Sequence, residues 1–415
     1  MRPDPVRPAA TAVFFTLALL LALAGSPGAL AGTPALDAAT ARAELRYAAD
    51  TALAVHPVLT TEGARTAFEG ELARQESRLG DAPTRQDVAL ALQLLLASLG
   101  DAHTTSAPQS AATDQLPVAF FATTDAILVS PVEGLGVPLP DVGILVRLGD
   151  LTPDALLGRM AGLIPGALPW VRYRTGQLLA TGPVLAWLGV LRQGRVEITV
   201  RAPDGTTTTH AVHLVQRSQL RGRSAPLGPR LQRAAGLGQD WTARGQTFLW
   251  RIDEASHTGL FWLLSCVDSE AYRGAVEAFF EAVQRDGGLL GMRRASSVIR
   301  VPPAPPVFTG DVVVLTNGAA FSSAGMVAVL LSDNGLARVA GEPVGADAGG
   351  YGDILTFHTP GLELPFTVST KRFRRPSRDA VSPSRLPVDL PLPLTAADVI
   401  QGRDVLAAWL PATAP

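Results

Sequence analysis

The chain has 415 residues, of which 47% are hydrophobic and 17% charged, and a formal net charge of −2. This length can bury the cores of roughly two or three domains, and the balanced charge gives no basic surface for nucleic acid or an anionic membrane. The only cysteine, Cys266, cannot form an internal disulfide. The sequence has neither a Cys/His cluster with zinc spacing nor a glycine-rich phosphate loop, so it predicts no metal and no cofactor.

The N-terminus has the three parts of a secretory signal. Two arginines precede an apolar run at 12–25, which is too short to span a bilayer comfortably. Ala29 and Ala31 then form a small-x-small cleavage site. We therefore expect residues 1–31 to be a signal peptide and the protein to be exported, to the periplasm or the extracellular space. A retained N-terminal anchor is the alternative.

The next region, 32–110, has a helical pattern. Apolar residues recur at three- and four-residue spacing across 36–99. Asp37 and Thr84 are suited to cap helices at their N-termini, and Gly100 is suited to end the last one. We expect an N-terminal helical region.

In the region 111–216 the period shortens to that of strands. Asp204 and Gly205 predict a hairpin turn, and helices are expected at 153–163 and 176–191. The runs typical of strands are VAFFA, AILVSPV, GILVRLG and VEITVRA. Together they predict a small mixed domain.

The rest of the chain divides into two parts. Residues 217–245 are rich in Arg, Gly, Pro and Gln without a clear period, which predicts a linker or mobile loop. In 246–415 strands alternate with helices, expected at 271–284 and 321–334, which favours an α/β layer. The segments LTFHTPG and LPFTVST predict a hairpin near its end.

Two polar residues of this pattern could carry chemistry. Ser322 stands where an apolar strand meets a helix, and a helix N-terminus favours developing negative charge. On the residues alone, an N-cap serine explains it better. His103 follows a helix-ending glycine in a polar turn, which suits an accessible general base. The other five histidines lack such flanks and are interpreted as packing or surface residues.

Two segments resemble the tail-specific, or C-terminal-processing, serine peptidases, the family that includes the core of tricorn protease. SLGDAHT (98–104) resembles the element that carries the family's histidine. NGAAFSSAG (317–325) resembles the turn that carries its nucleophilic serine, and GEPVG (341–345) resembles the Gly-Glu segment that follows. Further counterparts run to the C-terminus, so the resemblance covers nearly all of the mature chain. It implies a crotonase-like ββα-superhelix catalytic domain over 246–415 and a PDZ-like module over 111–216.

The resemblance also implies roles for single residues. Ser322 would be the nucleophile and His103 the general base of an acyl-enzyme mechanism. Some family members use a lysine base instead, but Lys371, the only lysine here, stands too far along the chain for that role. A third group would orient the histidine, and the candidates are Asp379 or, under a strict alignment, Ser382. The resemblance thus implies a peptidase acting on peptides or unfolded chain ends.

One family element has changed. The Asp-Leu-Arg-x-Asn-x-Gly-Gly motif corresponds to 291–298, where Ser297 and Val298 replace the paired glycines. Backbone N–H groups of Ser297 and Ser323 are the expected oxyanion donors, yet valine resists the positive φ that such turns often need. Loss of one donor typically costs about a hundredfold or more in rate. A catalytically inactive relative, serving as a peptide-binding or envelope-associated module, is therefore the alternative function.

Overall fold

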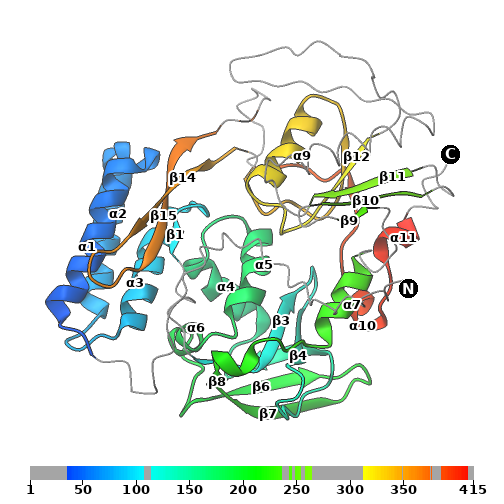
Figure 1. The fold of residues 1–415 in the computed structure, drawn as a ribbon, viewed down its shortest axis with the longest axis horizontal. Helices are drawn as coiled ribbons and strands as arrows, with labels where there is room; N and C mark the ends of the chain where they lie inside the picture. Colours follow the sequence, from blue (N-terminus) through cyan, green and yellow to red (C-terminus); the bar gives the residue numbers. More distant parts are fainter. Residues whose placement is uncertain are drawn as a thin grey trace, which may run out of the picture.

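The computed structural model describes residues 35–106, 114–235, 243–244, 248–253, 258–263, 312–347, 349–373, 375 and 385–409 (Figure 1). The expected signal peptide (1–31), the helix expected at 271–284 and the site candidates Ser297, Asp379 and Ser382 lie outside the described residues. None of the helices that the structure describes combines the length and apolar character needed to cross a membrane.

The N-terminal region is helical, as the periodicity predicted. Asp37 accepts a hydrogen bond from the Thr40 N–H at the start of α1, and Thr84 forms a capping box with Asp87 at the start of α3. Both caps were predicted from the sequence. The elements are α1 (Ala38–Val55), the 3-10 helix η1 (Pro57–Thr60), α2 (Glu62–Arg78) and α3 (Arg85–Ala97).

The next part is a five-stranded antiparallel sheet with helices packed against it. The strand order β3-β4-β5-β6-β7 follows the sequence, and Asp204-Gly205 forms the turn between the last two strands. The strands are β3 (Val118–Ala122), β4 (Ile127–Pro131), β5 (Gly143–Leu148), β6 (Arg195–Arg201) and β7 (Thr207–His213). Two short strands flank this sheet in the sequence. They are β2 (Asp114–Gln115), before β3, and β8 (Val215–Gln216), after β7, and they pair with each other.

The helices of this part differ from the prediction in one place. The expected helix at 153–163 is α4 (Pro153–Leu163), but 176–191 is not one helix. Instead α5 (Leu168–Leu178) begins early, and α6 (Gly182–Trp187) begins at a new turn. Prolines occupy the first turn of both helices, where the missing N–H costs nothing, so each proline marks a helix start rather than an interior.

The first half of the expected linker is folded. Residues 217–235 form the 3-10 helix η3 (Arg217–Leu220) and the helix α7 (Leu227–Ala234). Leu227 and Ala234 are buried in one cluster with Val399 of α10 (Ala396–Gln401). Apolar residues at 227, 231 and 234 have the spacing of one helix face, a signal that the abundant Arg and Gly of the segment concealed.

The C-terminal part contains a small parallel sheet and one helix that connects two of its strands. β12 (Val313–Thr316) pairs in parallel with β13 (Arg338–Gly341), and β16 (Leu390–Pro391) adds to the other edge of β13. The helix α9 (Ser323–Asp333) joins β12 to β13, as a parallel connection requires. Four short elements lie outside this sheet: β9 (Ala243–Arg244), β10 (Phe248–Asp253), β11 (Thr258–Leu263) and α11 (Val405–Trp409).

A second C-terminal element crosses to the N-terminal helices. The predicted hairpin forms as β14 (Tyr351–His358) and β15 (Pro365–Arg372), and β1 (Thr105–Ser106) pairs with β15 to make a three-stranded sheet. Phe366 and Val368 of β15 are buried in the same core as Leu45 of α1 and Leu92 of α3. In Figure 1 the orange hairpin accordingly runs beside the blue helices, and α5 lies beneath α9.

A buried carboxylate fastens the hairpin turn to α1. Glu44 is 3% exposed, and its two oxygens accept the N–H groups of Gly361 (2.9 Å) and Leu362 (2.8 Å). A charged acceptor of two backbone donors is a strong hydrogen-bonding group, and its loss leaves buried N–H groups without a partner.

We therefore predict that Glu44→Ala lowers the free energy of unfolding by about 1–3 kcal/mol, the usual cost of unsatisfied buried donors. Glu69→Ala, at an exposed position on α2, is the matched control and should stay within about 0.5 kcal/mol of wild type. Urea unfolding followed by circular dichroism measures both. Equal stability of the two variants would show that the link from Glu44 to the turn contributes little.

Candidate active site

Ser322 occupies a strained position between β12 and α9. Its backbone angles are φ 56° and ψ −128°, a conformation that costs a residue with a Cβ on the order of 1–3 kcal/mol. It stands at the N-cap of α9, yet its side chain makes no capping hydrogen bond. The hydroxyl is therefore not used for helix capping. A serine held at a strained strand-to-helix turn is the arrangement found where such a side chain must face a substrate.

The first N–H groups of α9 follow this serine in the chain, and two of them donate to nearby carbonyls. The Ala324 N–H donates to the Phe321 carbonyl (3.2 Å) and the Met326 N–H to the Ser322 carbonyl (2.9 Å). No described residue accepts a hydrogen bond from the N–H of Ser323. An unused donor at a helix N-terminus favours negative charge beside it.

Close backbone contacts fix the shape of the turn. A Cβ at Gly318 would meet the carbonyl oxygen of Pro169 at 2.6 Å, and one at Gly345 would collide with the carbonyl of Gly318. The Gly345 N–H also donates to the Ala320 carbonyl (3.1 Å). The two segments that carry the sequence resemblance, NGAAFSSAG and GEPVG, thus pack against each other and against the start of α5.

Glu342, in the GEPVG segment, accepts a hydrogen bond from the C-terminal part of the chain. Its carboxylate accepts the Leu394 N–H (2.8 Å). Burial raises the pKa of Glu342, and this hydrogen bond and the charge of Arg172 oppose that rise. Glu342 thereby ties the end of β13 to the C-terminal segment.

His103 lies in the loop between α3 and β1, and β15 holds that loop. The Thr367 hydroxyl donates to the His103 carbonyl (2.6 Å), next to the β1–β15 pairing. The His103 side chain is 19% exposed, so its imidazole is accessible from one side. Because β15 comes from the far end of the chain, the position of this histidine depends on the C-terminal hairpin.

His103 contacts the turn that carries Ser322 through the Phe321 ring. The His103 and Phe321 ring centroids are 4.4 Å apart with planes tilted by 31°, and Phe321 stacks on Trp170 of α5 at 4.0 Å. Phe321 immediately precedes Ser322, so His103 packs against the residue next to Ser322 in the sequence. No hydrogen bond joins His103 to Ser322 in the described structure; catalytic hydrogen bonds often form only when substrate is bound.

Asp101 is the buried centre of the histidine loop, and the sequence analysis did not single it out. Its carboxylate accepts the Thr104 hydroxyl (2.6 Å), the Ser369 hydroxyl (2.6 Å) and His56 Nε2 (3.2 Å). It also accepts the backbone N–H of His103 (3.0 Å). Burial alone would raise the pKa of Asp101, but the donors around it hold that pKa far below its usual range, so the group is ionised. An aspartate two residues before the histidine is the signal of an Asx turn that could have identified it.

Lys371 and His56, two other residues considered in the sequence, both make contacts with aspartates. Lys371 is exposed on β15, and its ammonium pairs with Asp353 at 2.5 Å, consistent with its exclusion as a base. His56, interpreted as a packing or surface residue, is buried and bonded to Asp101. Asp379 and Ser297 lie outside the described residues. Among the residues that the structure describes, Asp101 is the carboxylate next to the His103 ring.

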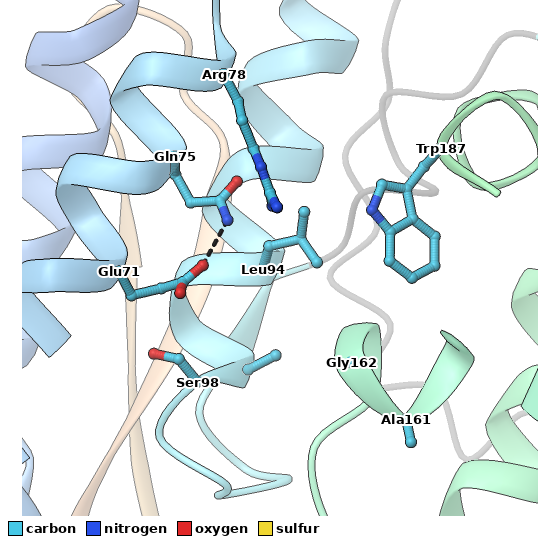
Figure 2. A pocket seen from close by; sticks show the side chains of 9 residues that line it. Glu71, Gln75, Arg78, Leu94, Ser98, Ala161, Gly162 and Trp187 are labelled. Atoms are coloured by element: carbon cyan, nitrogen blue, oxygen red, sulfur yellow. Dashed lines mark hydrogen bonds between the residues drawn. The ribbon is translucent and has the colours of Figure 1, made fainter. Parts of the chain in front are cut away.

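A separate cleft lies away from these residues. It has a volume of about 400 Å³ and is formed between the α2–α3 pair and the α4 and α6 helices, with neither His103 nor Ser322 in its lining. Figure 2 shows Gln75, bonded to Glu71, on one side and Trp187 on the other.

No family model and no curated protein matches this sequence. Solved structures do match its fold. Mature CPAF superposes with a TM-score of 0.58 and 13% identity over 90% of this chain and 96% of CPAF. The complex of mature CPAF with lactacystin gives 0.57 and 13% over 90% and 97%. A serine-to-alanine mutant of CPAF gives 0.59 and 12% over 90% and 96%. This chain has the fold of CPAF.

Two further structures belong to proteins named as proteases. The photosystem II D1 C-terminal processing protease matches with a TM-score of 0.39 and 13% identity over 88% of this chain and 98% of its own. Tricorn protease matches with 0.38 and 12% over 90% of this chain and 36% of its own.

The Asp101 network makes stability depend on pH. A carboxyl whose pKa is lower in the folded than in the unfolded state stabilises the fold above the unfolded pKa, about 4, and this stabilisation is lost as the pH falls from there toward the folded pKa. Asp101→Asn should therefore cost about 1–3 kcal/mol at pH 7, and the difference from wild type should shrink below pH 4. Asp50→Asn, an exposed position on α1, is the control. Urea unfolding at several pH values measures the curves; a constant difference from pH 7 to 3 would contradict the prediction.

Proposed function

We propose that the protein is an exported serine-type peptidase, with Ser322 as nucleophile and His103 as general base. The observation that carries the proposal is the conformation of Ser322. Ser322 has φ 56° at the start of a helix, and its side chain makes no capping hydrogen bond in the described part of the chain, so helix capping does not offset the strain. Such strain is usual where a nucleophile must be exposed.

The surrounding groups supply the other parts of an acyl-transfer site. His103 would take the proton of the Ser322 hydroxyl as it attacks a peptide carbonyl, and return it to the leaving amine. The free N–H of Ser323 would bind the developing oxyanion. Water would then hydrolyse the acyl-enzyme, with the same histidine as base. For proton transfer the imidazole must come within about 3 Å of the hydroxyl.

The shared fold supports the proposal of a serine peptidase. Three CPAF structures share this fold: the mature protein, its complex with lactacystin and a serine-to-alanine mutant. We infer that 246–415 is a crotonase-like catalytic domain and that the five-stranded sheet and its helices within 111–216 form a PDZ-like module. Peptides or unfolded chain ends are the proposed substrates. Export is proposed from the signal sequence at 1–31.

A fluorophosphonate probe, which phosphonylates activated serines, tests this function. Wild-type protein should be labelled and Ser322→Ala should not, because the probe bonds to that hydroxyl. Ser332→Ala, at the far end of the same helix, is the matched control and should be labelled as wild type. His103→Gln should label on the order of a hundredfold more slowly, since the base is lost.

Two results would contradict the proposal. Folded wild type that stays unlabelled at high probe concentration would favour an inactive relative with a binding role. Labelling that persists in Ser322→Ala would place the reactive serine elsewhere.

A further inference from the structure

We propose that Asp101 is the positioning carboxylate of His103, and that a second histidine, His56, holds Asp101 in place. The inference rests on the proposed peptidase function, in which His103 is the base. Sequence reasoning had suggested Asp379 or Ser382 for this role. Asp101 is instead contributed by the histidine loop itself, two residues before the imidazole that it would orient.

The two oxygens of Asp101 have different tasks. Oδ2 accepts three donors, the hydroxyls of Thr104 and Ser369 and the Nε2 of His56. Oδ1 accepts the His103 backbone N–H at 3.0 Å and lies 3.6 Å from His103 Nδ1. Because Oδ2 already accepts three hydrogen bonds, Oδ1 is the oxygen that faces the imidazole.

This division fixes the tautomer of His103. An ionised carboxylate only accepts hydrogen bonds, so the nitrogen that faces it must carry the proton. The neutral His103 ring therefore has its proton on Nδ1 and a free lone pair on Nε2. A free Nε2 is what a general base beside a serine hydroxyl needs. At 3.6 Å the contact is slightly long, and a small ring movement toward Oδ1 would close it.

His56 has the opposite tautomer, which explains why it binds the same carboxylate. Its Nδ1 accepts the Val58 N–H at 3.2 Å, so the proton of the neutral ring is on Nε2, where it is donated to Asp101. The His56 side chain is fully buried, and its ring centroid lies 4.8 Å from that of Tyr351, with the planes tilted by 49°. It cannot turn to another partner without breaking both bonds. His56 thus makes Asp101 rigid from the side opposite to His103.

An asparagine at 101 would invert the arrangement at His103. Its amide oxygen must take the place of Oδ2, because three donors converge there. Its NH2 group would then take the place of Oδ1, where it can no longer accept the His103 backbone N–H and would instead donate to Nδ1, which moves the ring proton to Nε2. The base would be lost although the shape of the side chain is nearly unchanged. Removal of one Oδ2 donor, as in Ser369→Ala, leaves the carboxylate and Oδ1 in place.

Nitrogen-15 NMR of histidine-labelled protein, at a pH where the rings are neutral, tests the proposal. In wild type, His103 should show the Nδ1–H tautomer and His56 the Nε2–H tautomer, with signals assigned from His103→Gln and His56→Gln. In Asp101→Asn, His103 should switch to Nε2–H, and fluorophosphonate labelling should fall on the order of a thousandfold. Ser369→Ala should keep the Nδ1–H form of His103, even if it loses a comparable amount of thermal stability.

The outcomes separate this inference from the function on which it rests. An Nε2–H form of His103 in wild type overturns the inference, and this measurement needs no variant to fold. An Nδ1–H form that survives in folded Asp101→Asn also overturns it. Wild type with the Nδ1–H form but no labelling would remove the peptidase function and leave the positioning role of Asp101 supported.

Discussion

The rest of the candidate site depends on one ionised carboxylate, that of Asp101. Ionised carboxylates are rarely buried unless donors surround them, and here the donors come from three separate parts of the chain. His56 follows α1, Thr104 belongs to the histidine loop, and Ser369 lies on β15. The same carboxylate therefore joins the N-terminal helices to the C-terminal hairpin and sets where His103 lies. Stability and site geometry are coupled at this residue, since the bonds that keep the carboxylate charged also orient the loop.

The serine side of the site has a different physical basis. Ser322 is held by backbone geometry, with Gly318 and Gly345 allowing the close approach of two turns and of Pro169. Trp170, Phe321 and His103 form a row of rings in contact that runs from α5 to the imidazole. The α5 helix of the middle part thus supports the turn that carries Ser322. A shift of α5 would move Phe321, and with it the surface that His103 contacts.

Local signals in the sequence were enough for much of the fold. The caps at Asp37 and Thr84, the turn at Asp204-Gly205, and the strand before Ser322 each depend on residues close in the chain, and each was predicted. The start of α5 was missed because Pro169 was not taken as a first-turn residue, and α7 because its apolar spacing is short and lies among arginines. Ser322 and His103 were proposed as site residues through motif resemblance. Asp101 and His56 were missed because their roles arise from contacts between residues far apart in sequence, such as Asp101 with Ser369, which periodicity cannot reveal.

The central claim is that His103 and Ser322 form one catalytic unit, and a crystal structure of the protein reacted with a peptidyl phosphonate tests it most directly. The account predicts phosphorus bonded to Ser322 Oγ, a phosphonyl oxygen within hydrogen-bond distance of the Ser323 N–H, and His103 Nε2 turned toward the Ser322 oxygen, with Nδ1 on Asp101. An adduct on another residue, or an imidazole that stays against Phe321 and out of reach of the adduct, would contradict it.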